Sequence, residues 1–192
     1  MAKKPFIQFK FDGAVESAVK NAEKMAGKMI TQISKETEAN IRNLISTALA
    51  QGIPPYDAAR AIVPLIGLTP QQGQAALKFR EKLIDNGLPL TKVNEQVDRY
   101  ADKLLNRRAE QIARTEIMDA LNNGQNESWQ QAQEQGFLSE NATKEWIVTP
   151  DDALCPECEP MDGRTVPINE DFPNGDPPLH PSCRCTIAIG TP

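Results

Sequence analysis

The fold of this chain is decided by two motifs, CPECEPMDG at residues 155–163 and PPLHPSCRC at residues 177–185. Together they hold every cysteine and the only histidine of the sequence: Cys155, Cys158, His180, Cys183 and Cys185. Two residues separate Cys155 from Cys158, a spacing that lets one tight turn direct two sulfurs to one point, and His180 and Cys183 repeat it. Two such pairs about twenty residues apart are typical of a tetrahedral zinc site.

The spacing predicts one structural Zn²⁺ held by four of these five side chains. The first set is Cys155, Cys158, His180 and Cys183, and Cys185 is the alternative to either His180 or Cys183, because a C-x-C pair can also converge. The loop between the pairs has few apolar residues. A segment below roughly 40 residues usually needs a disulfide, a metal ion or oligomerisation to fold. A structural zinc supplies on the order of 10–16 kcal/mol. The alternatives are one or two disulfides, or reduced thiols; the spacing favours metal in a cytosolic setting.

The composition predicts a soluble globular protein of one domain, or of one domain with an appendage. The 192 residues are 40% hydrophobic and 24% charged, with a formal net charge of −5. This acidic balance argues against a dedicated nucleic-acid binder, which is normally basic on at least one face. No apolar run approaches the length of a membrane span, and the start MAKKPFIQFK lacks the apolar core of a secretory signal. We therefore expect no membrane association.

Helical periodicity dominates the first two thirds of the chain. Apolar residues recur at three- and four-residue steps from about Asp12 to Gln51, which predicts one long helix. Its apolar stripe is thin, so it is either an arm or partner-facing coil, or the ordinary first helix of a bundle. A short helix is expected after Pro55.

Two further helices are predicted before the cysteine motifs. Thr69 is the expected N-cap of one helix, which ends at Asn86-Gly87. Thr91 is the expected N-cap of a longer one, with a break near Asn123-Gly124 and a last helix closed by Gly136.

Two short strands are predicted to flank the cysteine motifs. KEWIVTP at residues 144–150 alternates Trp146 and Val148 with less apolar positions, and CTIAI at residues 185–189 is the second candidate. Paired, the two strands would hold the metal site between them. The expected fold is mainly α, an elongated helical body with a small C-terminal β/zinc-knuckle subdomain. The predicted units are an N-terminal long helix or arm (1–53), the helical body (54–136) and the knuckle subdomain (137–192).

An ordered series of motifs in this sequence resembles the phage head-morphogenesis family that includes the F protein of phage Mu. The series begins with IARTE (112–116) and NNG (122–124), passes Trp129 and Gly136, and continues with WIVTPDD (146–152) and the two cysteine motifs. The resemblance covers roughly Leu68 to Ile187. The matching residues are Arg114, Thr115, Glu116, Trp146, Asp151, Asp152, Cys155, Cys158, Asp162, Gly163, Pro178, His180, Pro181, Cys183, Arg184 and Cys185.

The resemblance implies a minor capsid protein and a structural assembly factor, not an enzyme. Such proteins associate with the portal protein or the major capsid protein in multiple copies per head, and assist head assembly, DNA packaging or genome delivery. They lie in the virion, at the capsid interior or portal vertex, and in the host cytoplasm during assembly. Contact with packaged DNA would be non-specific.

Two other functions compete with this interpretation. The first is a metal-dependent nuclease, which usually needs further histidines; this chain has one. The second is a zinc-ribbon nucleic-acid-binding module, which the acidic net charge disfavours. We also expect Arg114 either to hydrogen-bond Asp151 or Asp152 beside the metal site, or to pair with Glu110 on a solvated helix face. Asp162-Gly163 is expected to form a turn.

Overall fold

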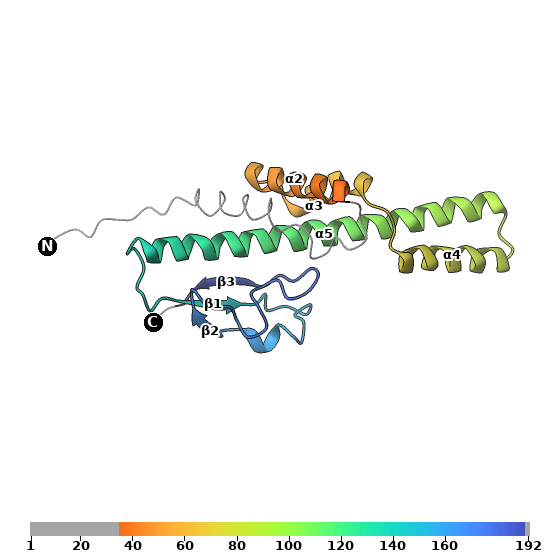
Figure 1. Ribbon diagram of the computed structural model, residues 1–192. Coiled ribbons are helices and arrows are strands. Elements are labelled where there is room, and N and C mark those ends of the chain that lie inside the picture. The colour runs from red at the N-terminus through yellow and green to blue at the C-terminus, as the bar shows by residue number, and fades with distance from the viewer. Residues whose placement is uncertain (1–34, 191–192) are drawn as a thin grey trace.

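The structure, a computed structural model, describes residues 35–190. As predicted, the fold is mainly α, with an elongated helical body and a small C-terminal sheet beside the Cys/His cluster (Figure 1). The elements in chain order are α2 (Lys35–Gln51), α3 (Pro55–Ile62), the 3-10 turn η1 (Val63–Leu65), α4 (Pro70–Asp85), α5 (Leu90–Glu134), β1 (Thr143–Ile147), the 3-10 turn η2 (Glu159–Met161), β2 (Thr165–Pro167) and β3 (Thr186–Ile189). The predicted long helix is present from Lys35, and its residues 12–34 lie outside the described part.

Helix α5 is the spine of the molecule. Its 45 residues give a length of roughly 68 Å at 1.5 Å per residue, and Figure 1 shows α2 and α3 along one side of it and the sheet along another. The predicted break at Asn123-Gly124 is wrong, because α5 runs through both residues. Its N-cap is Pro89 rather than Thr91, which lies inside the first turn.

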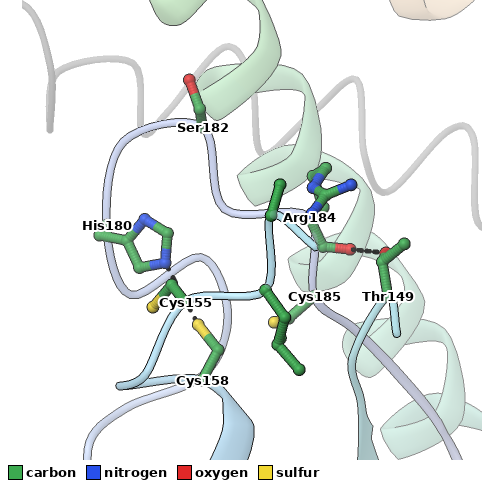
Figure 2. A pocket seen from close by; sticks show the side chains of 9 residues that line it. Thr149, Cys155, Cys158, His180, Ser182, Arg184 and Cys185 are labelled. Atoms are coloured by element: carbon green, nitrogen blue, oxygen red, sulfur yellow. Dashed lines mark hydrogen bonds between the residues drawn. The ribbon is translucent and has the colours of Figure 1, made fainter. Parts of the chain in front are cut away.

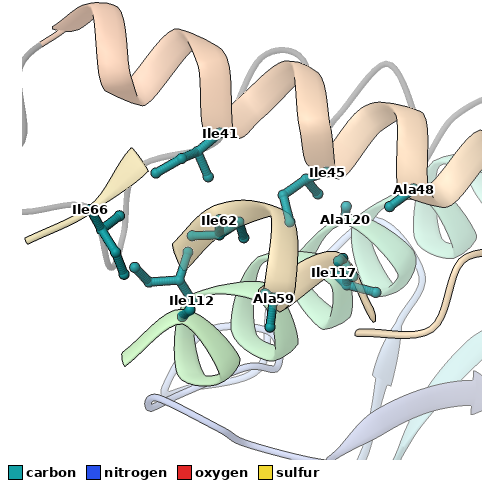
Figure 3. Close-up of a cluster of buried hydrophobic side chains, with 12 residues drawn as sticks. Ile41, Ile45, Ala48, Ala59, Ile62, Ile66, Ile112, Ile117 and Ala120 are labelled. Carbon is teal, nitrogen blue, oxygen red and sulfur yellow. The ribbon is translucent and has the colours of Figure 1, made fainter. Parts of the chain in front are cut away.

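The first hydrophobic core joins α2, α3 and the middle of α5. Isoleucines from all three helices interdigitate with alanines that let the helix backbones approach closely (Figure 3). Its buried members are Ile41, Ile45, Ala48, Ala58, Ala59, Ile62, Ile66, Ala109, Ile112, Ala113, Ile117 and Ala120. The described part of the first predicted helix, α2, therefore packs against α3 and α5 as the first helix of a bundle rather than as a separate arm.

Helix α4 forms a hairpin with the first half of α5. Thr69 caps it as predicted, in a reciprocal capping box with Gln72: the Thr69 hydroxyl accepts from the Gln72 amide at 3.2 Å and the Gln72 side chain accepts from the Thr69 amide at 3.0 Å. The rings of Phe79 and Tyr100 pack across the hairpin, with centroids 4.8 Å apart. The helix ends before Gly87, which takes the left-handed conformation at φ 75°.

The predicted strands β1 and β3 pair antiparallel, with Trp146 opposite Ile187. The sequence did not predict β2, which pairs with the other edge of β1 and gives the order β2-β1-β3. Lys144, Trp146 and Val148 face inward. Trp146 lies edge-on to Phe172 in a second core that also holds Trp129 of α5, so the sheet is anchored to the spine.

Within residues 35–190, no helix is both long enough and apolar enough to span a bilayer.

Candidate metal centre

Two turns, each closed by a backbone hydrogen bond between the first and fourth residue, present the cysteine and histidine side chains. In the first, the Cys158 amide donates to the Cys155 carbonyl at 3.0 Å, and η2 follows directly. In the second, the Cys183 amide donates to the His180 carbonyl at 3.1 Å. The two pairs, Cys155 with Cys158 and His180 with Cys183, therefore each form the tight turn that a separation of two residues predicts.

All five predicted side chains come together around Cys158. Cys155, Cys158 and His180 form one group whose donor atoms lie within 4.8 Å of one another, and Cys158, Cys183 and Cys185 form another. Cys158 Sγ lies 3.2 Å from His180 Nε2 and 3.8 Å from Cys183 Sγ. In a tetrahedral zinc site with Zn–S near 2.3 Å, two sulfurs are about 3.8 Å apart. The four cysteines of the chain are all free thiols, so the disulfide alternative is not realised.

A small cavity lies between the two turns (Figure 2). It has a volume of about 30 Å³, and Cys155, Cys158, His180 and Cys185 are among its lining residues. Such a volume holds a single small species such as one water or one ion. Cys183 does not line the cavity, but its Sγ lies 3.8 Å from that of Cys158, a separation that two ligands of one zinc would have. An ion here would thus be held by Cys155, Cys158 and His180, with either Cys183 or Cys185 as fourth ligand.

The ring of His180 is oriented for coordination. Its Nδ1 lies 3.0 Å from the Pro181 carbonyl, which can only accept, so Nδ1 carries the proton and donates. Nε2 then has its lone pair free and faces Cys158. Metal-binding histidines are typically fixed in this way, with the second ring nitrogen donating to a carbonyl.

The thiols of Cys158 and Cys185 lie in an environment that opposes their ionisation. Burial, followed by hydrogen bonds with Cys155 and Cys185, raises the pKa of Cys158. Burial, followed by the charge of Cys183, also raises the pKa of Cys185. A catalytic Cys–His pair needs the opposite, a thiol of lowered pKa. A metal ion is the ordinary means of deprotonating such a buried thiol cluster.

Trp146 supplies an independent fit to a thiolate ligand. Its indole N–H is buried without a well-aligned acceptor. It is nevertheless close enough to Cys185 to oppose the rise in the pKa of that thiol. A metal-bound thiolate accepts a hydrogen bond better than a neutral thiol, so loading of the site would satisfy this buried donor.

Arg114 is exposed on α5, and the described residues show no pairing of Arg114 with Asp151, Asp152 or Glu110, so neither predicted contact is formed. Asp151 pairs with Arg184 instead. Arg184 forms a bidentate salt bridge with Asp151, one arm of which measures 2.6 Å. This pair ties the segment before the first turn to the second turn. Asp162-Gly163 forms the predicted turn: Gly163 has φ 70° and the Asp162 carboxylate accepts from the Val148 amide at 3.1 Å.

Two residues of α5 that support the second turn were not predicted. Thr115 accepts from the Ser182 amide, and Asn122 bonds the backbone on both sides of that turn. Thr115 lies in the IARTE motif and Asn122 in NNG, so the resemblance marked the right motifs. Spacing alone gave no sign of contacts that span more than fifty residues.

One of the comparisons with known proteins identifies a family. No curated protein and no solved structure was found to match the chain. A family model described as phage Mu protein F like protein matches residues 25–188, which includes all of the described helices from α2 onward, the sheet and the five metal-ligand candidates. The chain therefore belongs to the phage Mu protein F-like family of head-morphogenesis proteins.

Proposed function

We propose that this chain is a non-enzymatic minor head protein that binds the portal protein or the inner face of the capsid and assists packaging or genome delivery. One structural Zn²⁺ holds its C-terminal subdomain folded. The family match over residues 25–188 carries this proposal.

The closed character of the metal centre supports a structural role for the zinc. Catalytic zinc sites keep an open position for water or substrate, whereas structural sites are filled by four protein side chains. Here five candidate ligands lie around Cys158, and four of them line a cavity of about 30 Å³. Five side chains are more than a four-coordinate structural site needs, so no coordination position has to be filled by water or substrate.

The chain has no second histidine that could act as the general base of a nuclease. The single histidine of the chain is one of the proposed zinc ligands, so the general base would have to be another group. We expect no nicking of supercoiled plasmid by the purified protein with magnesium or manganese. Plasmid-nicking activity that co-purifies with the protein, and that is lost when a residue of this chain is substituted, would overturn the assignment as a non-enzyme.

The partner is tested by co-expression with the portal protein of the same phage, and separately with its major capsid protein. We expect one of the two to co-purify with a tagged chain at a fixed ratio. A chain that captures neither contradicts the proposed association.

Two variants locate the docking region. Deletion of residues 1–34 removes no described member of the first core, the first of which is Ile41. If the N-terminal part docks, this deletion weakens co-purification, whereas C155S, which removes a candidate zinc ligand and so disturbs the C-terminal subdomain, retains it. The reverse pattern would assign docking to the knuckle subdomain.

A further inference from the structure

A stripe of polar side chains on α5 lies beneath the metal centre. Thr115 and Asn122 are both buried, at 4% and 2% exposure. They are seven residues apart, which places them two turns apart on the same face of a helix. The apolar residues Ile112 and Ile117 belong to the other core, against α2 and α3. Buried polar groups need partners, and both Thr115 and Asn122 find partners in the backbone of the second cysteine motif.

Thr115 holds the turn between His180 and Cys183. Its hydroxyl donates to the Gln111 carbonyl at 2.7 Å and accepts from the Ser182 amide at 2.9 Å. Ser182 is the only described non-glycine residue with positive φ, at 61°, a conformation that costs energy for a residue with a Cβ. The bond from its amide to Thr115 holds the backbone in that conformation.

Asn122 holds the segments on either side of the same turn. Its amide nitrogen donates to the carbonyls of Pro177 and Cys185, both at 3.2 Å, and its carbonyl oxygen accepts from the Thr186 hydroxyl at 2.8 Å. One side chain therefore connects the chain before His180 to the chain at Cys185.

We propose that Thr115 and Asn122 are positioning residues of the metal centre: they set the distance between His180 and the cysteines that follow it, without contacting the ion. The proposal rests on the zinc site of the proposed function. It assigns a role to the IARTE and NNG motifs and makes metal affinity depend on α5, more than fifty residues away in sequence. Loss of such a supporting contact typically weakens metal affinity by about 10–100-fold.

The test compares three single variants of the full chain. T115V keeps the volume and removes the acceptor, T115S keeps the hydroxyl, and T47V is the matched control. Thr47 makes the same bond to the carbonyl four residues before it, at 2.8 Å, but is exposed on α2. Zinc affinity is measured by competition with a chromophoric chelator, and ligand geometry by the visible spectrum of the Co²⁺-loaded protein.

We expect T115V to bind zinc about 10–100-fold more weakly with an altered cobalt spectrum, and T115S and T47V to match the parent chain. A T115V variant with parental affinity and spectrum overturns the positioning role while leaving the zinc site standing. A parent chain that binds no zinc overturns both.

A measurement on the unmutated protein tests the proposal even if the T115V variant fails to fold. In the zinc-loaded parent chain the Ser182 amide should exchange with solvent slowly, because it is bonded to a buried hydroxyl. Rapid exchange at Ser182, beside slow exchange at the Cys183 amide, would contradict the proposal without any substitution.

Discussion

Lys144 is fully buried in the central strand of the sheet, on the same face as Trp146. Its ammonium lies 2.6 Å from the Asp176 carboxylate and 5.7 Å from the centre of the Phe172 ring. The alternation of β1 predicts the inward direction of this position, but nothing near Lys144 in sequence indicates a partner 32 residues away. A buried charge is tolerable only when it is paired and hydrogen-bonded.

Removal of the negative partner should therefore be costly. We expect D176N to lower the free energy of unfolding by about 3 kcal/mol, because it leaves a buried ammonium without a counter-charge. Chemical denaturation of the zinc-loaded protein measures this. D57N, which breaks the exposed pair of Asp57 with Arg60, is the control and should have little effect. Equal effects of the two substitutions would show that Lys144 is not held as described.

Asp151 offers a pH-dependent test of the contact between the two turns. Hydrogen bonds from Arg184 lower the pKa of Asp151 to about 2. Since the folded-state pKa is depressed, the stabilisation from this pair is present above the ordinary value of 3.8 and is lost as pH falls through about 2.

Carbon-detected NMR titration should find the low pKa of Asp151 in the parent chain and a value near the ordinary one in R184A. R164A removes another exposed arginine, whose guanidinium bonds the Pro160 carbonyl instead, and should leave the pKa of Asp151 unchanged. A normal pKa in the parent chain would show that the salt bridge does not form in solution.

At the scale of the elements, capping chemistry decides where helices begin. Thr69 and Thr91 both precede a helical pattern and were both predicted to be N-caps. Only Thr69 has a glutamine three residues later to complete a capping box. α5 instead begins after Pro89, and Thr91 lies exposed inside it.

The two threonines therefore form a matched pair of substitutions. We expect T69A to cost about 1 kcal/mol of stability, because the first turn of α4 loses its side-chain acceptor. T91A should have no cost, since alanine is the better helix former inside a helix. Thermal unfolding of both variants measures the difference, and a larger loss from T91A would contradict the assigned start of α5.

Most helices and strands, and the side chains of the candidate site, were predictable from the sequence. Capping residues and three- and four-residue steps predicted α3 and α4, the alternation around Trp146 predicted β1, and CTIAI was the second strand candidate, now β3. The two C-x-x-C-like spacings and the C-x-C pair predicted which five side chains lie together. The break at Asn123-Gly124 was wrong because local propensity is a weak guide inside a packed helix. Asn122 gains three bonds to the subdomain there and Gly124 is buried. β2 was missed because a strand of three residues that ends in proline is too short to show an alternation of apolar and polar side chains. It is recognised as a strand only through its pairing with β1.

At the scale of the whole molecule, α5 is shared between two cores that are otherwise separate. One core joins it to α2 and α3, and the other joins Trp129 to the sheet and the cysteines. Three of the four cysteines are buried members of the second core. The folding of that core is therefore expected to depend on the metal, whereas the first core contains no candidate ligand.

Metal removal should consequently unfold one end of the protein. We expect chelation to abolish amide protection in residues 143–190 and to leave the helices from α2 to the middle of α5 protected, with most of the helical circular dichroism retained. Hydrogen exchange followed by mass spectrometry locates the loss. Unfolding of the whole chain in one step would show instead that the two cores are a single cooperative unit.

Quantitative metal analysis tests the zinc centre most directly. Protein purified without added zinc should contain one equivalent of zinc per chain, and after exchange into Co²⁺ it should show the intense visible bands of a tetrahedral thiolate site. A metal-free protein whose residues 143–190 remain folded, with four thiols open to titration after unfolding, would contradict the assignment of Cys155, Cys158, His180 and the following cysteines as a metal centre.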